Sequence, residues 1–252
     1  KFLNNDFTKI RSKPKTSAHM GIHRNLDPLY NFSKTRLVKN LVHDLPLRTS
    51  ALRTLGAFAN ITSSESFLND LAFAKNIDPF KIRKNHLDDE RAIEVLENLE
   101  NTMKKSHAKP NNYRGIGFSR YKNSAAYCAV GVELNISDDL DIKLINAWIT
   151  VDAGEIAYED GIKAQAEGGF IQAASWSLYE EVLFDTKEII SKDWDSYKII
   201  GFDNIPIFTT NVIDRKGSTY LGVGEVVAGP TGGAISNALR DALGQRIKTM
   251  PF

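Results

Sequence analysis

The stretch from Tyr127 to Gly154, "YCAVGVELNISDDLDIKLINAWITVDAG", decides the fold of this 252-residue chain. It contains two runs rich in β-branched, aromatic and other apolar residues, "YCAVGVELNI" and "LINAWITVDAG", a composition typical of strands. The acidic pair Asp138 and Asp139 between the runs predicts a hairpin turn. We therefore expect two neighbouring strands here and a β-rich region around them.

Two helices are expected on the N-terminal side of this hairpin. The sequence "TSSE" at residues 62–65 has the form of a capping box, so it predicts a helix that begins there and ends within residues 76–79. Asp88 or Asp89 is expected to cap a second helix, whose apolar positions share one face: Ala92, Val95, Leu96, Leu99 and Met103. Residues 1–45 show no clean period and predict irregular strands and loops.

On the C-terminal side we expect a long helix, a strand and a final helix. Asp160 or Gly161 starts the long helix, and its inward positions follow helical spacing: Ile162, Ala166, Phe170, Ala173, Ala174 and Leu178. Each of the two glycines at residues 168–169 costs about 1 kcal/mol relative to alanine, so close packing or close approach of a ligand must explain them. The run "KIIGFDNIPIFTTNVI" predicts a strand with turns, and residues 231–243 predict the last helix, with Gly244 as its stop.

Composition describes an ordinary globular protein and says little about partners. The 32 basic and 31 acidic residues are spread along the chain, so nothing indicates nucleic acid or an anionic membrane as a partner. Cys128 is the only cysteine, and the fold therefore cannot depend on an internal disulfide. No apolar run reaches the roughly 18 residues of a membrane helix, and the sequence after Lys1 lacks the layout of a signal peptide.

One carboxylate lies in an unusually permissive backbone. The segment 219–230, "TYLGVGEVVAGP", places Glu225 among glycines at 222, 224 and 229. Glycine lets a backbone adopt φ > 0 or come close to a ligand, so Glu225 is a candidate for presentation to a bound group. A turn with an exposed acid explains the same residues and stays open as the alternative.

Two further segments have the composition of ligand cradles. "LRTLGAF" places Arg53 three residues before Gly56. An arginine can bind a phosphate through two parallel N–H groups, and a glycine lets backbone amides approach the same phosphate. "QAEGGF" places Gln165 one helical turn before Gly168 and Gly169, which suits a polar ligand lying against a helix. The alternative for the first segment is a surface arginine with a turn, and the alternative for the second is a packed helix crossing.

Other common kinds of site are disfavoured. His19 and His23 have the spacing of metal ligands on a helix, but the residues between them form a poor helix and no third ligand is evident. Cys128 lies in an apolar run and is expected to be a small buried hydrophobic residue rather than a nucleophile. The sequence shows no Ser-His-Asp order, no G-x-S-x-G elbow and no Walker-type G-x-x-x-x-G-K-[ST] motif.

Taken together and in order, four segments resemble the C-terminal part of the molybdenum-cofactor-binding subunit of the xanthine dehydrogenase and aldehyde oxidase family, nearest the isoquinoline 1-oxidoreductase type. They are "PLRTSALRTLGAFANITSSESFLNDLAFAKNIDPFKIR", "RGIGFSRYKNSAAYCAVGVELNI", "VDAGEIAYEDGIKAQAEGGFIQAASWSLYEEVLFD" and "LGVGEVVAGPTGGAISNALRDALGQRIKTMPF". They span about residue 46 to the end, and their order carries the resemblance more than any single motif. The resemblance implies an α+β molybdopterin-binding fold of mixed strands with packed helices.

The resemblance also implies a role for the isolated carboxylate. In this family the glutamate of the G-V-G-E loop lies beside the molybdenum and acts as the general base, and Glu225 is the matching position. A carboxylate within hydrogen-bond reach can take the proton whose loss turns a water-derived group into a nucleophile. The pterin's sulfurs ligate the metal in this family, so no protein metal ligand is expected. The residues that the resemblance assigns to cofactor binding are Arg53, Gly56, Gln165, Gly168, Gly169 and Gly224.

Partners follow from the same resemblance. The resemblance divides the chain into two regions: residues 1–105, with the R-x-x-G loop and two helices, and residues 106–252, with the β-rich region and the G-V-G-E loop. Family members carry several hundred residues before these two regions, so we expect both to be parts of one larger subunit. The cofactor would be molybdopterin, alone or as a dinucleotide, and electrons would leave to a small subunit with [2Fe–2S] clusters. The substrate would be an aldehyde or an N-heterocycle, and the compartment stays open between cytoplasm and periplasm of a bacterium.

Two alternatives to this interpretation remain. The first is a non-catalytic cofactor-binding or assembly fragment of the same fold. The second is an unrelated α+β enzyme that uses Glu225 on its substrate without a metal.

Overall fold

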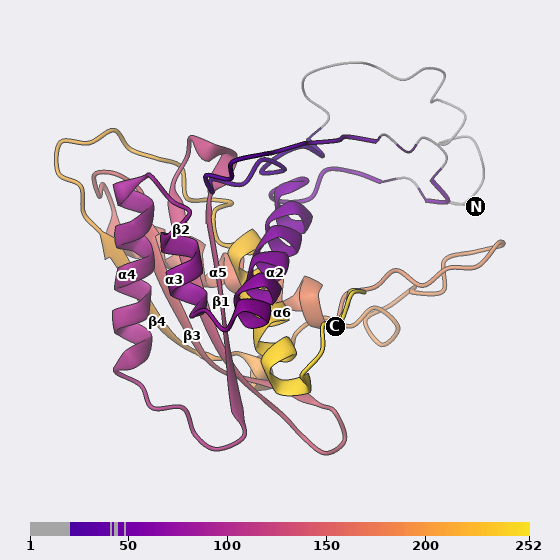
Figure 1. Ribbon diagram of the computed structural model, residues 1–252. Helices are drawn as coiled ribbons and strands as arrows, with labels where there is room; N and C mark the ends of the chain where they lie inside the picture. Colours follow the sequence, from indigo (N-terminus) through magenta and orange to yellow (C-terminus); the bar gives the residue numbers. More distant parts are fainter. Residues whose placement is uncertain (1–20, 41, 43–44, 48) are drawn as a thin grey trace.

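The computed structural model of the protein describes residues 21–40, 42, 45–47 and 49–252 (Figure 1). His19 of the histidine pair lies outside the described residues.

A mixed four-stranded sheet forms the centre of the molecule. The strands are β1 (Asn112–Arg120), β2 (Tyr127–Ile136), β3 (Ile142–Asp152) and β4 (Ile207–Ile213), in the order β1-β2-β3-β4. The first three strands pair antiparallel, whereas β4 pairs parallel to β3. The expected pair of neighbouring strands is therefore confirmed, and β4 confirms the strand predicted after the long helix.

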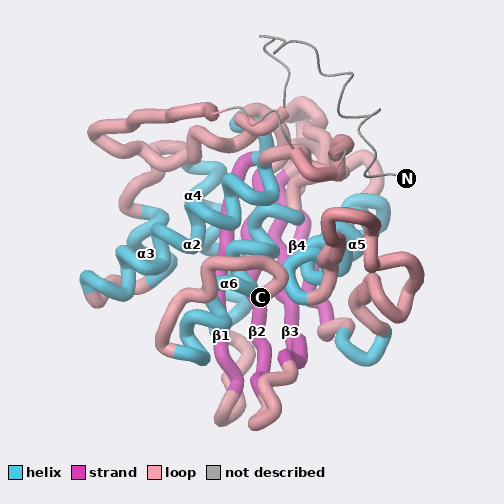
Figure 2. The backbone as a smooth tube through the Cα atoms, turned by 90° about the vertical axis from the view of Figure 1, so that its right-hand side faces the viewer, coloured by secondary structure: helices cyan, strands magenta, loops and turns pink. Residues whose placement is uncertain are grey.

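Helices cover both faces of this sheet. They are α2 (Ala57–Lys75), α3 (Pro79–Lys84), α4 (Glu90–Lys104), α5 (Glu159–Leu178) and α6 (Ala228–Leu243), with short 3-10 turns at Tyr121–Asn123 and Phe202–Asn204. Figure 2 shows α5 and α6 in front of the sheet, while α4 lies behind it and α2 runs beside α6. The arrangement is the expected α+β fold with mixed strands and packed helices.

The alternation of side chains along the strands builds one apolar layer on each face. The layer under α5 and α6 contains Cys128, Val130, Val132, Ile149, Val151, Phe170, Ile235 and Leu239, among others. The layer under α4 contains Val95, Leu96, Leu99, Phe118, Ala129 and Trp148. Burial of both layers is the main force that holds the helices onto the sheet.

Helix α6 lies unusually close to β1 because glycine removes side chains between them. A Cβ atom at Gly115 would lie 2.2 Å from the Ala234 carbonyl oxygen, and one at Gly117 would lie 2.2 Å from the Pro230 carbonyl oxygen. The helix is buried along most of its length. Since Glu225 lies shortly before α6, this packing determines where the carboxylate emerges.

The predicted start of the first helix is wrong, and the reason is local. Helix α2 begins at Ala57, and the "TSSE" residues lie inside it. The hydroxyls of Thr62 and Ser64 donate to carbonyl oxygens, and Glu65 is buried in an ion pair, so none of them caps a helix. The predicted end is confirmed at Asn76, which has a left-handed φ of 53°.

Helices α4, α5 and α6 agree closely with the expectations, whereas the short helix α3 was not predicted. Asp89 caps α4 by accepting hydrogen bonds from two backbone N–H groups, and the five predicted apolar positions of α4 are buried. Helix α5 begins at Glu159, and its six predicted inward positions are buried. Helix α6 ends at Gly244 as predicted but begins at Ala228 rather than residue 231, because Pro230 is tolerated in a first turn.

Candidate functional site

Glu225 lies on the connection between β4 and α6. We call residues 219–225 of this connection the Glu225 loop. Gly222 and Gly224 of this loop are exposed, Glu225 is half-buried, and the next residues are fully buried at the start of α6. The loop is therefore anchored at its C-terminal end and open on its glycine side.

The Glu225 carboxylate is held by the backbone of a distant turn. The Thr54 N–H donates to Glu225 Oε1 over 2.7 Å, although the two residues are 171 positions apart. Thr54 and Leu55 both have left-handed backbones, with φ of 76° and 54°. Such conformations of non-glycine residues cost of order 1–3 kcal/mol each and persist only where the surroundings hold them.

Arg53, the residue before Thr54, brings several predicted site residues together. Its guanidinium donates from Nε to the Gly224 carbonyl oxygen and from Nη2 to Gln165 Oε1 at 3.1 Å. A Cβ atom at Gly169 would lie 3.4 Å from the same Nη2. The Arg53 side chain thus connects the turn after residue 52 to both the Glu225 loop and α5.

The remaining predicted glycines occupy different surroundings. A Cβ atom at Gly56 would lie 2.5 Å from the Ile22 carbonyl oxygen, so this glycine allows the backbone near residue 22 to pack against the turn. Gly168 is exposed, and a Cβ atom there would meet nothing within 4 Å. A Cβ atom at Gly169 would lie at an ordinary van der Waals distance from Arg53, so no contact within the described residues requires a glycine at either position of the pair on α5.

Tyr121, at the end of β1, also faces Glu225. Its side chain is 3% exposed, and its hydroxyl has no hydrogen-bond partner of ordinary geometry among the described residues. Burial first, and then the Glu225 carboxylate, raise the pKa of Tyr121 to about 12, while Arg24 opposes the shift. The hydroxyl is therefore protonated at neutral pH and available as a donor beside the carboxylate.

The segment that carries Arg24 ties the turn at Tyr121 to the rest of the site. Asn25 donates to the Arg120 carbonyl oxygen at 2.8 Å and accepts from the Lys122 N–H at 2.9 Å. Eight described non-glycine residues have positive φ. Thr54 and Leu55 lie in the turn that holds Glu225, and Asn25, Lys122 and Asn123 lie next to Arg24 and Tyr121 in sequence.

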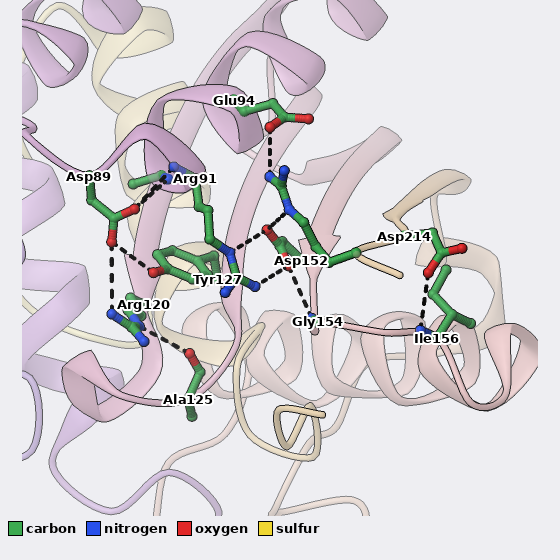
Figure 3. A network of polar contacts seen from close by, with 12 residues as sticks. Asp89, Arg91, Glu94, Arg120, Ala125, Tyr127, Asp152, Gly154, Ile156 and Asp214 are labelled. Atoms are coloured by element: carbon green, nitrogen blue, oxygen red, sulfur yellow. Dashed lines mark hydrogen bonds and ion pairs between the residues drawn. The ribbon is translucent and has the colours of Figure 1, made fainter. Parts of the chain in front are cut away.

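A buried aspartate anchors the chain just before the Glu225 loop (Figure 3). Asp152, at the end of β3, is fully buried and accepts hydrogen bonds from Arg91, Arg215 and the Gly154 N–H. Burial alone would raise the pKa of Asp152, but these donors hold it below its ordinary value. Because Arg215 shortly precedes the Glu225 loop, this network fixes the N-terminal side of the loop to β3 and α4.

Sequence reasoning did not identify Thr54, Gln172 or Tyr121 as site residues. Gln172 Oε1 accepts from Arg53 Nη1 at 3.2 Å, and its position seven residues after Gln165 on the same helix face was a usable signal. Thr54 acts through its backbone, and Tyr121 reaches Glu225 through the tertiary fold, so no local pattern marks either residue.

Cys128 is fully buried, and burial raises the pKa of its thiol, which confirms the interpretation of this residue as a small hydrophobic one. Across the described ranges, no group of three or more His, Cys, Asp or Glu side chains is arranged to hold a metal ion. No helix within those ranges combines the length and the apolarity needed to cross a membrane.

The fold and the site together define a class: an α+β domain that presents a carboxylate on a glycine-rich loop beside an arginine-bearing turn. A family model described as the molybdopterin cofactor-binding domain matches residues 74–206, which is more than half of the chain. The chain belongs to this family, and the resemblance inferred from the sequence is confirmed.

Two curated relatives extend the match over most of the chain. It is 29% identical over 242 residues to a subunit of nicotinate dehydrogenase from Pseudomonas putida, covering 89% of this chain and 20% of that protein. It is 24% identical over 206 residues to the beta subunit of isoquinoline 1-oxidoreductase from Brevundimonas diminuta, covering 80% of this chain and 26% of that protein. The chain thus spans about a quarter or less of the length of these relatives.

A solved structure supports the fold independently. Quinoline 2-oxidoreductase from Pseudomonas putida 86 superposes with a TM-score of 0.69 at 11% identity, covering 80% of this chain and 51% of that chain. At this identity the similarity establishes the fold alone. The mixed sheet with its packed helices is therefore the molybdopterin-binding architecture that the sequence predicted.

Proposed function

We propose that this chain is the molybdopterin-binding part of a molybdenum hydroxylase subunit. It oxidises an N-heteroaromatic or aldehyde carbon with oxygen from water, and the electrons leave to an iron-sulfur subunit. The observation that carries the proposal is the meeting of Glu225, the Arg53–Thr54 turn and α5 at one point. The names of the two relatives, a nicotinate dehydrogenase and an isoquinoline oxidoreductase, favour an N-heteroaromatic substrate over an aldehyde.

The residues at this junction fit a pterin cofactor. Cβ atoms at Gly168 and Gly222 would meet nothing within 4 Å, so a bound group has room beside α5 and the Glu225 loop. Thr54 Oγ1 and the Tyr121 hydroxyl are buried near Glu225 without hydrogen-bond partners among the described residues. Buried polar groups are normally paired, and a pterin, which is rich in nitrogen and oxygen, offers such partners. The exposed glycines and the backbone of the Arg53–Thr54 turn are the parts of this chain that would hold it.

Glu225 supplies the base in this proposal. When bound, molybdenum supplies Lewis-acid and redox chemistry. The Thr54 N–H engages Oε1 of Glu225, which leaves Oε2 to take a proton from the water-derived group. The buried Tyr121 beside Glu225 would close part of the surroundings of the carboxylate to bulk water.

The test is the isosteric substitution Glu225→Gln in the full-length subunit, produced in a host that makes the molybdenum cofactor. An amide keeps the shape of the side chain but cannot take the proton, so kcat is expected to fall by about 10²- to 10⁴-fold. Molybdenum and pterin content per subunit are expected to equal those of the wild type, as measured by metal analysis and cofactor fluorescence.

A matched control is Glu159→Gln, at the exposed start of α5, where the carboxylate pairs only with Lys163 among the described residues. This variant is expected to keep wild-type kcat and cofactor content. Wild-type turnover by Glu225→Gln would refute the proposed role of Glu225. A full-length subunit that binds the cofactor but oxidises none of the N-heterocycles or aldehydes offered would favour the non-catalytic alternative.

A further inference from the structure

The side chain of Arg53 is engaged by protein groups on three sides. Its Nε donates to the Gly224 carbonyl oxygen, its Nη1 to Gln172 Oε1 and its Nη2 to Gln165 Oε1. A bidentate contact to a phosphate requires two parallel N–H groups of the guanidinium. In this structure each guanidinium nitrogen already donates to an acceptor of the protein, so protein contacts alone fix the direction of the side chain.

Helix α5 is built to receive this guanidinium. Gln165, Gly169 and Gln172 are spaced as i, i+4 and i+7, so they form one stripe along the helix. The two glutamines accept from the guanidinium on either side of Gly169, where a Cβ atom would lie in ordinary contact with it, 3.4 Å from Nη2.

We infer that Arg53 is a positioning residue, which clamps the Glu225 loop to α5 and so orients the Glu225 carboxylate. The inference rests on the proposed role of Glu225 as the base. Arg53 Nε holds the carbonyl group of Gly224, the residue directly before Glu225, and the Thr54 N–H holds the carboxylate itself. Two consecutive residues of one turn thus fix the loop at its backbone and at its functional group.

The neutral acceptors on α5 separate this role from simple charge attraction. Gln165 and Gln172 fix the direction of the guanidinium through its N–H groups, and lysine cannot reproduce that fork geometry. Arg53→Lys keeps the positive charge, so it preserves most of an electrostatic contribution to cofactor binding. It removes the three-sided contact, so it should release the loop.

The test is hydrogen–deuterium exchange of the peptide that covers residues 219–227 in the full-length subunit, prepared with and without cofactor. Arg53→Lys and Gln172→Ala are both expected to speed exchange of this peptide by about tenfold or more, because a hydrogen bond to a charged group is lost. In the cofactor-loaded subunit kcat should fall in both variants, while KM and molybdenum content stay at the wild-type values. Gln172→Ala is the milder change, and it keeps the test valid if Arg53→Lys folds poorly.

Lys163→Gln, on the exposed part of α5, is the control and should leave exchange and kcat unchanged. Unchanged loop exchange in both test variants overturns the inference. Loss of molybdenum and pterin with unchanged loop exchange also overturns it and makes Arg53 a cofactor ligand. Because exchange is measured without turnover, faster exchange in a subunit that proves to bind no molybdenum would support the clamp and refute the proposed function.

Discussion

Replacing Glu65 by glutamine should lower the free energy of unfolding by about 3–5 kcal/mol, the usual effect of breaking a buried ion pair. Glu65 is 1% exposed and its partner Arg83 is fully buried, with Arg83 Nε 2.8 Å from Glu65 Oε2. The carboxylate also accepts from the Tyr30 hydroxyl at 2.6 Å and from the Phe118 N–H at 2.9 Å. Glutamine keeps the shape but leaves the guanidinium buried without a counter-ion.

A second substitution separates this electrostatic effect from a general loss of packing. Arg83→Met alone leaves the carboxylate buried without its partner and should destabilise by a similar amount. The double variant Glu65→Gln/Arg83→Met removes both charges. It should therefore be more stable than the sum of the single effects predicts, with a coupling of about 2 kcal/mol or more.

Urea unfolding followed by tryptophan fluorescence measures these differences through the midpoint and the slope. Glu97→Gln is the matched control: its carboxylate lies 3.7 Å from Lys84 Nζ and its side chain is 53% exposed. This exposed pair should contribute at most about 1 kcal/mol. A midpoint for Glu65→Gln as close to the wild type as that of Glu97→Gln, or purely additive single effects, would refute the reasoning.

Two further predictions concern the sheet. The hydrogen bonds that depress the pKa of Asp152 stabilise the fold fully above its unfolded pKa of about 3.9, and this contribution is lost as the pH falls below that value. Asp152→Asn should therefore lower the free energy of unfolding by about 3 kcal/mol at neutral pH. Below pH ~4 the free energy of unfolding of this variant should depend less on pH than that of the wild type, and parallel curves would contradict this. Gly117→Ala should destabilise by about 1–3 kcal/mol, because its Cβ atom would lie 2.2 Å from the Pro230 carbonyl oxygen. Gly168→Ala places its Cβ atom in open space, so it should be neutral or stabilising by up to about 1 kcal/mol. Thermal melting measures both variants, and shifts of the melting temperature with the same sign and size would contradict this packing argument.

The helices and strands that the sequence predicted well are those whose signals are local. Helix α4 has a side-chain cap at Asp89 and five apolar residues at helical spacing, and all of these act in the structure as expected. The start of α2 was mispredicted because its first residue follows Gly56, which offers no side-chain cap. The hydroxyls that imitate a cap at residues 62–65 are used instead inside the helix and against the α6 segment.

The candidate site was predictable only through the resemblance of several segments taken together. Arg53 and Gly224 are 171 residues apart and Arg53 and Gln165 are 112 apart, and no periodicity of the sequence connects such positions. Helical spacing relates Gln172 to Gln165 once the latter is suspected. Tyr121 approaches Glu225 through the end of β1, so it could be found only when the fold was known.

The turn at Thr54 and Leu55 shows most clearly what the fold contributes beyond the sequence. The glycine of this segment, Gly56, has an ordinary φ of −71°, and its missing side chain instead makes room for the backbone at Ile22. The left-handed conformations fall on threonine and leucine, at a cost of order 1–3 kcal/mol each. A relaxed right-handed backbone at these two positions would extend α2 and turn the Thr54 N–H along the helix axis, away from Glu225. The strained turn instead directs that N–H to the carboxylate while the Arg53 side chain reaches α5, so the strain and the clamp together hold Glu225 in one orientation.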